Sequence, residues 1–445
     1  MRFFLLISLT LAIFESSARA QAPLSSSALK LTLDDAIARG IKNNLAVLNR
    51  ETSDKLTRVD RIRSLAALLP TVNAEASQYV QETNLAVFGF RFPGIPTIIG
   101  PYGYQDLRAN ASMDLYNRAS RLRLKSADQN IRASELSIQD ARDLIVASVA
   151  NAYLTIISSA ARVEASRAEV TTAQALYERA RDQHTAGISP AIDELRSQVE
   201  LKSRQQQLLA AENNLAKSKL SLAVVISLPA GQDFELADTA PYAPLEAEAP
   251  EQLMERAKRS RSDYRALQAQ LEAAKISRDA ALAQRLPVLT AGGNYGVDGV
   301  NQAQLHQTFV FQGSLKVNVF DGGRIRADVA EADAIIEQHK NEIASMETHM
   351  NADIRMALLD LKSAADQVVV AESNLDLANQ ALAQARDRFT AGVTDNIEVV
   401  QAQDALAGAQ ENVIASRYAH NSAKVALARA VGMTESNLKL YMGSK

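Results

Sequence analysis

Residues 180–189, with the sequence ARDQHTAGIS, recur in the same chain as ARDRFTAGVT at residues 385–394. The offset between the two glycines is 392 − 187 = 205 residues, and it holds without a gap as far as Leu222 and Leu427. Two unrelated alanine-rich helices would match at scattered positions and would not keep one register over so long a stretch. The chain therefore contains an internal duplication.

Each copy of this stretch has the residues of a turn between two helices. Gly187 and Gly392 suit the left-handed backbone conformation that ends a helix. Ser189 and Thr394 are predicted N-caps of the returning helix, with Pro190 at its first position in the first copy. An ordinary hairpin turn has the same geometry, so the pattern leaves open whether the turns bind a partner.

The segments on both sides of the turns keep an apolar residue at every seventh position. Such a heptad pattern is typical of helices packed along their length as coiled coils. An arm of about 65 residues would extend about 100 Å, which suits a strut or tunnel better than an enzyme. The four stripes are Leu124, Ile131, Ile138, Ile145 and Ala152; Leu201, Leu208, Leu215 and Leu222; Ile336, Ile343, Met350 and Ala357; and Val399, Leu406 and Val413.

Four other segments alternate apolar and polar residues, which is typical of strands with two different faces. We expect strands over about 70–83, 104–117, 287–299 and 306–320. Each has about 10 residues or slightly more, the length that crosses a bilayer when tilted. A soluble sheet with one wet face has the same periodicity. The aromatic stretch from Phe88 to Tyr104 is expected to be a surface loop between the first two strands.

Four strands do not close a barrel by themselves. An open edge in lipid leaves backbone groups unsatisfied, at several kcal/mol each, so the strands would have to be shared between chains. Two chains would give about eight strands around an interior filled by side chains, whereas three would give about twelve and leave a lumen. A conducting function therefore favours a trimer.

The N-terminal residues 1–20 have the features of a secretory signal peptide. Arg2 precedes an apolar run from Phe3 to Phe14, and Ala18-Arg19-Ala20 supplies a small-x-small cleavage pattern. The chain has no cysteine, which excludes disulfides and an acylated N-terminal cysteine as lipid anchor. We expect no further run of about 18 apolar residues and therefore no transmembrane helix.

Composition and motifs argue against an enzyme or a nucleic-acid-binding protein. The formal net charge of −3 gives no basic footprint for nucleic acid. The histidines show no paired spacing such as His-Glu-x-x-His, and no glycine-rich loop is placed to cradle phosphate. We therefore expect no catalytic, cofactor or metal site. The five histidines are His184, His306, His339, His349 and His420.

The order of these features resembles the TolC family of outer-membrane efflux and secretion channels, over essentially the whole chain after the signal peptide. In the first copy Tyr116-Asn117-Arg118 stands where the second copy has the turn FDGG, which departs from the family pattern. The matching residues are LTLDDAIA at 31–38, Asn43-Asn44, the pairs Leu69-Pro70 and Leu286-Pro287, FDGG at 320–323 and the two Thr-Ala-Gly turns.

This resemblance implies an α+β membrane protein that combines duplicated helical hairpins with four transmembrane strands per chain. Three chains would complete a 12-stranded barrel above a periplasmic tunnel, with a belt around the tunnel formed by residues around 22–60, 229–262 and 432–445. The implied division is a signal peptide at 1–20, a first repeat at 21–228 with its hairpin at 121–228, an equatorial linker at 229–262, a second repeat at 263–433 with its hairpin at 323–431, and an equatorial tail at 434–445.

The resemblance also implies a function, the exit duct of a tripartite efflux or type I secretion system in the outer membrane of a Gram-negative cell. Its partners would be two further copies of the chain, a periplasmic adaptor, an inner-membrane efflux pump or ABC exporter, and outer-membrane lipid. A periplasmic coiled-coil scaffold without a pore would explain the heptads equally well, but it does not need the strands. The adaptor would dock at Thr185, Ala186, Gly187, Ile188 and Ser189 and at Thr390, Ala391, Gly392, Val393 and Thr394.

In this family the periplasmic end closes by coiling of the inner hairpin, with acidic rings at the constriction. The corresponding positions here are Asp193, Phe389, Glu398 and Gln401. Phe389 lacks a hydroxyl and Thr394 is not basic, so the closing links of the family are largely missing. A ring of carboxylates would concentrate cations, although acids also favour the first turn of a helix. The two explanations are compatible, so the sequence leaves open which of them accounts for Asp193 and Glu398.

Overall fold

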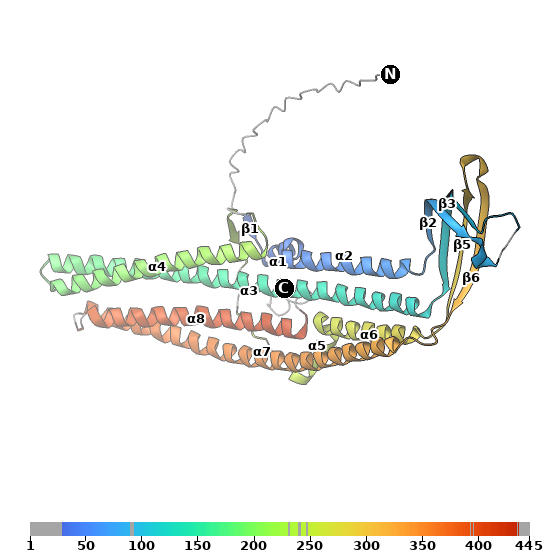
Figure 1. Ribbon diagram of the computed structural model, residues 1–445. Helices are drawn as coiled ribbons and strands as arrows, with labels where there is room; N and C mark the ends of the chain where they lie inside the picture. The colour runs from blue at the N-terminus through green and yellow to red at the C-terminus, as the bar shows by residue number, and fades with distance from the viewer. Residues whose placement is uncertain are drawn as a thin grey trace, which may run out of the picture.

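The computed structural model describes residues 29–89, 93–229, 232–238, 242–245, 248–391, 393–394, 396–433 and 435. The predicted signal peptide, Gly392 and the tail other than Glu435 lie outside these residues. Long helices run side by side from two hairpin turns at one end to a four-stranded sheet at the other (Figure 1).

The two halves of the chain have the same order of long elements. This order confirms the duplication and the α+β class with long helical hairpins. The first half contains β1 (Leu29–Leu31), α1 (Leu33–Asn43), α2 (Leu45–Ala66), β2 (Thr71–Asn84), η1 (Leu85–Phe88), β3 (Ile98–Tyr116), α3 (Arg118–Thr185) and α4 (Ala191–Val225). The second contains β4 (Phe234–Leu236), α5 (Pro250–Ser260), α6 (Ser262–Ala283), β5 (Val288–Gly299), η2 (Gln302–Gln304), β6 (His306–Lys316), α7 (Arg324–Thr390) and α8 (Asn396–Val431).

The long helices pair through the predicted apolar stripes. In α7 the buried residues follow one another at alternating spacings of four and three, which is the heptad repeat of a coiled coil. Many of them are alanines, whose small side chains let the helices approach closely. The predicted stripe of α7 is therefore confirmed at Met350 and Ala357, whereas the predicted stripe of α3 is only half-buried along its length. The buried run of α7 includes Met350, Ile354, Ala357, Leu361, Ala364, Val368 and Ala371.

The helices α2 and α6 lie end to end with α4 and α8, respectively (Figure 1). The N-terminus of α2 is next to the C-terminus of α4, and the N-terminus of α6 is next to the C-terminus of α8. At the first junction the Asn44 Oδ1 atom accepts a hydrogen bond from Ala46 N at 2.8 Å, and Asn44 Nδ2 donates to Val225 O at 2.9 Å. At the second junction Arg261 Nη1 donates to Ala430 O at 3.5 Å. A polar side chain thus joins two helices end to end in each repeat.

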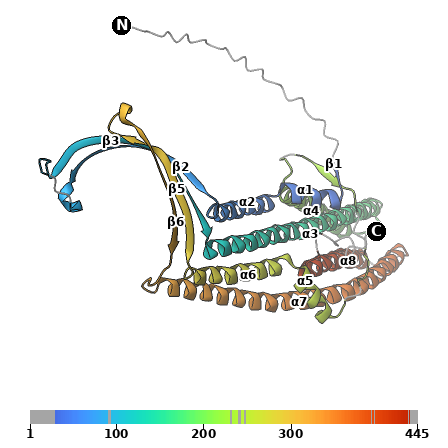
Figure 2. The ribbon, with the colours of Figure 1, turned by 90° about the vertical axis from the view of Figure 1, so that its right-hand side faces the viewer.

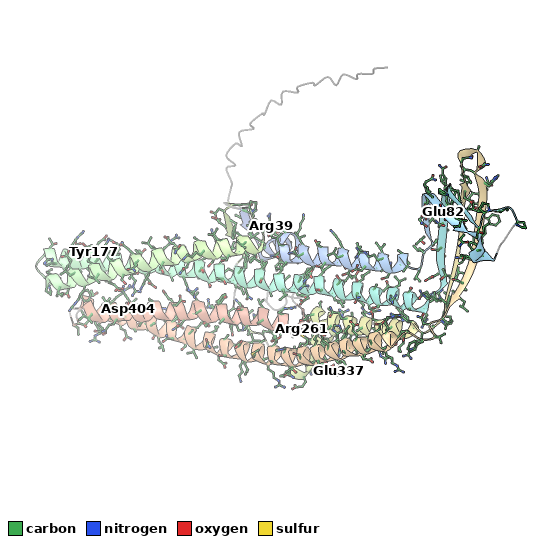
Figure 3. The ribbon with its side chains drawn as sticks, in the orientation of Figure 1. Arg39, Glu82, Tyr177, Arg261, Glu337 and Asp404 are labelled. Atoms are coloured by element: carbon green, nitrogen blue, oxygen red, sulfur yellow. The ribbon has the colours of Figure 1, made fainter. Side chains whose placement is uncertain are left out.

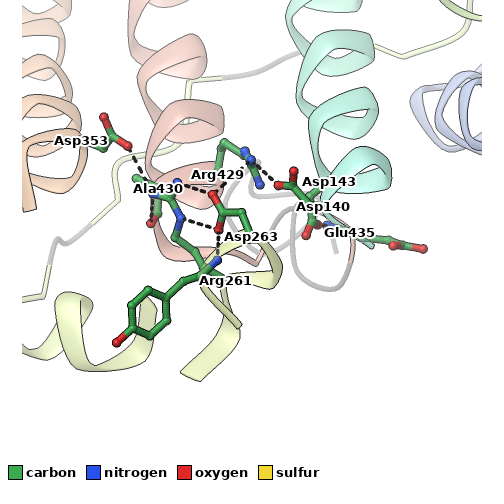
Figure 4. Close-up of polar contacts among 9 residues, drawn as sticks. Asp140, Asp143, Arg261, Asp263, Asp353, Arg429, Ala430 and Glu435 are labelled. Carbon is green, nitrogen blue, oxygen red and sulfur yellow. Dashed lines mark hydrogen bonds and ion pairs between the residues drawn. The ribbon is translucent and has the colours of Figure 1, made fainter. Parts of the chain in front are cut away.

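The Arg261 junction carries a network of charges (Figure 4). Arg261, which is 6% exposed, contacts Asp263 at 2.7 Å and Asp353 at 3.2 Å. Arg429 of α8 lies 2.6 Å from Asp140 of α3 and 3.9 Å from Asp263. Burial opposes ionisation of Asp263, but the hydrogen bonds and charge of Arg261 outweigh it and hold the pKa of Asp263 below its ordinary value. The network joins α3, α6, α7 and α8 at one level.

The middle of α3 is covered by the short equatorial elements, where β1 pairs in parallel with β4. Among the described residues one 18-residue window of α3 has a mean hydropathy of 1.7 and is long and apolar enough to span a membrane. The prediction concerned uninterrupted apolar runs, whereas this window reaches its mean hydropathy although polar residues such as Asn151 and Thr155 of α3 interrupt the apolar ones. Of this window 44% is buried. Val149, Tyr153 and Ile156 of α3 pack with Leu31 and Phe234 in one core.

The sheet has the order β2-β3-β5-β6, and all its pairs are antiparallel. It forms a curved extension beyond the helices, and its β2–β3 hairpin bends away from β5–β6 (Figure 2). β3 starts at Ile98, so the prediction of a loop as far as Tyr104 was wrong, because pairing with β2 continues to Asn84. β6 ends at Lys316 rather than near residue 320, because β5 offers no partner beyond Val288.

The register across the four strands sorts their side chains onto two faces, as the alternation predicted. We call them the apolar face and the polar face. Rows of the apolar face are Val72, Ala111, Gly293 and Phe311, then Ala74, Ala109, Tyr295 and Phe309. Rows of the polar face are Thr71, Ser112, Gly292 and Gln312, then Asn73, Asn110, Asn294 and Val310. Among the described residues the outer edges of β2 and β6 pair with no other strand.

Candidate functional site

The turn of the first hairpin has the left-handed glycine that the sequence predicts. Gly187 has φ 72°, its N–H donates to His184 O at 2.9 Å, and Ile188 N donates to Gln183 O at 2.9 Å. These bonds satisfy carbonyls at the end of α3. Its counterpart Gly392 lies outside the described residues, so the second turn cannot be compared at that position.

The predicted cap of α4 was wrong. Pro190, with φ −74° and ψ 153°, is the residue before the helix, and α4 starts at Ala191 without a side-chain cap. The backbone N–H of Ser189 is 3.4 Å from Gln183 O, which turns the residue towards α3 and leaves its Oγ buried without a hydrogen-bond partner. Thr394 likewise lies two residues before the first residue of α8, Asn396.

The tips expose apolar side chains. Ile188 and Val393 occupy equivalent positions (393 − 188 = 205) and are 76% and 69% exposed. Ala186 and Ala391 beside them are exposed as well. The hydroxyls of Thr185 and Thr390 bond to carbonyls of their own helices, at 2.8 and 2.7 Å. The exposed surface of these turn residues is therefore mainly apolar.

In each hairpin a polar side-chain contact joins the two helices across the turn. His184 Nδ1 lies 2.6 Å from Glu194 Oε2 in the first hairpin, and Arg388 Nη1 lies 2.9 Å from Glu398 Oε1 in the second. The predicted constriction acid Glu398 is thus paired within its own chain.

The other three predicted constriction residues have different neighbours. Asp193 lies 3.7 Å from Arg196 on the next turn of α4. Gln401 is exposed on α8. The ring of Phe389 lies under the Arg179 guanidinium of the first hairpin, 5.6 Å from its centroid. Phe389 therefore joins the two hairpins through its aromatic face and needs no hydroxyl to do so.

A second link between the hairpins escaped prediction. Arg204 of α4 is 7% exposed, and it contacts Glu200 Oε1 at 2.6 Å and Glu169 Oε2 of α3 at 3.2 Å. Its Nη2 atom also pairs with Asp404 of α8, near the hairpin end (Figure 3). Burial raises the pKa of Glu169, and the charge of Arg204 offsets this only in part. The position equivalent to Arg204 in the second copy is Ala409, so this link belongs to one repeat only.

A buried polar cluster lies on α8 near the equator. His420, Asn421 and Lys424 are buried, Lys424 Nζ donates to Ala243 O, and the His420 ring lies 4.8 Å from the ring of Tyr242. Burial, together with the charge of Lys424, lowers the pKa of His420 below its ordinary value.

The lowered pKa of His420 predicts an acid-dependent loss of stability. The unfolded chain protonates this histidine below about pH 6.5, whereas the folded chain keeps it neutral, so the free energy of unfolding falls as pH is lowered below that value. The slope is at most about 1.4 kcal/mol per pH unit. His420→Leu places the leucine that the first repeat has at Leu215, and it should make the melting temperature depend less on pH between pH 7 and 5. The control His349→Leu, at an exposed site, should leave that dependence as in the wild type. Equal profiles for the two variants would contradict this.

Among the described residues no group of three or more histidine, aspartate or glutamate side chains is arranged to hold a metal ion. What the geometry offers is a long helical wall, two exposed turns and a two-faced sheet. The sequence model of the outer membrane efflux proteins matches residues 41–227 and 253–433. The chain belongs to the outer membrane efflux protein family. It is accordingly a TolC-like protein of the outer membrane.

Two relatives illustrate the likeness to this family. The pyoverdine export outer membrane protein OpmQ of Pseudomonas putida is 26% identical over 318 residues, which cover 69% of this chain and 66% of that protein. The chain thus spans slightly less than two thirds of that relative. Outer membrane protein TolC of Vibrio cholerae is 22% identical over 382 residues, with 83% of each chain covered.

Solved structures of the family have the same fold. The Campylobacter jejuni outer membrane channel CmeC has a TM-score of 0.78 at 15% identity and covers 99% of this chain and 98% of its own. CusC, whose structures concern transmembrane channel formation, has a TM-score of 0.78 at 18% identity and covers 94% and 95%. The predicted family is therefore confirmed, and so is the α+β class of long helices with strands, whereas the 12-stranded barrel of a trimer stays a prediction.

Proposed function

We propose that three copies of this chain form the exit duct of a tripartite efflux or type I secretion system. The observation that carries the proposal is the sheet at the end of the helices, which has one apolar face, one polar face and two edges that no other strand of the described residues pairs with. An apolar face of this kind suits lipid, and a polar face suits a water-filled lumen. The unpaired edges require strands of another copy.

The helices support the same assembly. In the second repeat α6 packs against both α3 and α7, whereas its counterpart α2 packs against α3 and has no second long helix on its other flank among the described residues. That flank of α2 exposes Leu45, Leu48, Leu56 and Val59. In a ring of chains, α7 of the next copy would cover α2 as it covers α6 here. Three copies then give twelve strands, enough to leave a lumen.

The duct acts as a passive conduit, opened by a periplasmic adaptor that connects it to an inner-membrane pump or ABC exporter. We place the adaptor contact at the two tips, where Ile188 and Val393 expose apolar side chains. We place the constriction nearby, at Asp193, Phe389, Glu398 and Gln401. Because Glu398 is paired with Arg388, the acidic ring carries less free charge than its residue types alone would give.

Arginine substitutions on the two faces of β3 test the membrane-spanning role. Ala109→Arg places a charge on the apolar face and should cost about 2–4 kcal/mol near the bilayer centre, because the charge enters lipid. Asn110→Arg, the next residue, places the same charge on the polar face and should be tolerated. The measurement is the amount of SDS-resistant oligomer in the outer-membrane fraction. Equal yields for both variants in a chain that fractionates as soluble would favour the pore-free scaffold instead.

A further inference from the structure

Three tyrosines form a ladder on the β2–β3 hairpin beyond the reach of β5. Pairing of β3 with β5 ends at Gln105 and Gly299, whereas β2 and β3 remain paired as far as Asn84 and Ile98. On this two-stranded part the rings of Tyr79 and Tyr104 stack with centroids 4.8 Å apart and planes at 18°. Tyr102 continues the ladder, with its centroid 6.5 Å from that of Tyr104.

The register places this ladder on the polar face. Tyr79 pairs with Tyr104 four rows beyond the pair Glu75–Arg108, and side chains an even number of rows apart share a face. The neighbouring Val80 points to the opposite, apolar face. Aromatic side chains that anchor a sheet in a membrane belong on the lipid-facing side, so an interfacial girdle does not explain this ladder.

The rings are fixed, and they lie beside an excess of carboxylates. Gln81 Nε2 donates to the Tyr102 hydroxyl at 2.7 Å, and Thr83 Oγ1 lies 2.9 Å from the same hydroxyl. The adjoining rows of the polar face carry one guanidinium and three carboxylates, a formal charge of 1 − 3 = −2 per chain. These charged groups are Arg108, Glu75, Asp106 and Asp298.

We propose that this cluster, the tyrosine ladder with Glu75, Asp106 and Asp298, is a transit site for planar aromatic cations that leave the duct. The inference rests on the proposed function, which turns the polar face towards the lumen. Stacked rings offer flat faces that attract both other rings and cations. Surplus carboxylates raise the local concentration of cations and repel anions. A flat aromatic cation meets both requirements, whereas an aliphatic cation or an aromatic anion meets one.

Block of ion conductance tests this site. The purified full-length protein is inserted in planar bilayers in KCl, and ethidium is added as the aromatic cation. Tetraethylammonium serves as the aliphatic cation and pyrenesulfonate as the aromatic anion. Ethidium should reduce the conductance at a lower concentration than either control ion.

Substitutions separate the ladder from the rest of the sheet. The double variant Tyr79→Leu/Tyr104→Leu should raise the half-blocking concentration of ethidium about tenfold, since two ring faces are lost. Tyr104→Phe keeps the ring and should behave like the wild type. Tyr295→Leu removes a tyrosine from the apolar face and serves as the matched control.

The outcomes distinguish this site from the duct itself. Normal KCl conductance with the same ethidium block in the double variant, or equal block by tetraethylammonium, overturns the transit site and leaves the duct intact. Absence of any KCl conductance contradicts the proposed function. Ethidium binding to detergent-solubilised protein, measured by fluorescence polarisation, then decides on the cluster: weaker binding by the double variant than by Tyr295→Leu supports it, and equal binding overturns it.

Discussion

Replacing Arg204 with alanine is expected to loosen the hairpin ends and raise the conductance of the resting duct. The buried guanidinium compensates Glu169 and Glu200 on its own hairpin, and it also pairs with Asp404 of the second hairpin. Removing one member of a buried charge group costs about 3–5 kcal/mol, because the remaining charges stay buried and unpaired. Faster amide hydrogen exchange at both tips and larger resting currents in planar bilayers would report the loss.

Arg181→Ala is the matched control for this experiment. It removes the same charge close to the tip, but its exposed pair with Asp182 contributes little. Combining Arg204→Met with Glu169→Gln and Glu200→Gln should restore slow exchange, because no unpaired buried charge then remains. If Arg204→Ala exchanged and conducted like Arg181→Ala, the link between the hairpins would have no part in keeping the end closed.

Replacing Arg261 with alanine is expected to give the largest loss of stability in the middle of the molecule, about 3–5 kcal/mol. The change leaves Asp263 and Asp353 without their guanidinium and frees the carbonyl of Ala430 at the end of α8. The junction of α8 with α6 should therefore open before the coiled-coil arms do. Urea unfolding followed by circular dichroism measures the change.

Two comparisons define the role of the junction. Asn44→Ala at the equivalent position of the first repeat should cost about 1 kcal/mol, the usual value for a lost N-cap. Arg259→Ala, on the exposed side of α5, should cost nearly nothing. Equal midpoints for Arg261→Ala and Arg259→Ala would mean that the charge network of Figure 4 contributes nothing to stability.

Periodic features of this protein could be read from its sequence because they repeat locally. The seven-residue spacing that includes Met350 and Ala357 predicts which side of α7 is buried. The positive φ of Gly187 is a conformation that few other residue types adopt, so the turn could be predicted from that glycine. The alternation in β2, β3, β5 and β6 likewise fixes the two faces of the sheet.

Residues whose partners come from distant elements could not be found in this way. Arg204 follows Glu200 by four positions, which is also typical of a solvated helical pair, and only the fold brings Asp404 to it. Arg261 has Asp263 close in sequence, but Asp353 and Ala430 come from other helices. The repeats differ at this position, because the residue equivalent to Arg204 is Ala409. This difference is a sign in the sequence that Arg204 has a role in one repeat only.

The remaining errors arose where tertiary pairing overrode local chemistry. The aromatic stretch from Phe88 to Tyr104 favoured a loop, but β3 pairs with β2 on both sides of a register shift, from Gln105 to Tyr102 and again at Ile99 and Ile98. Pro190 was expected inside α4, yet its extended backbone places it just before the helix. In both places the local sequence indicated a turn correctly. Its exact bounds differ from the prediction because bonds to a neighbouring strand or helix determine them.

Single-channel recording of the purified wild-type protein in planar bilayers tests the central claim most directly. If three copies share their strands around a water-filled lumen, folded protein should insert in discrete events of uniform conductance, each corresponding to one trimer. Folded protein that associates with the bilayer and leaves it without stepwise conductance would contradict the account of this chain as a duct.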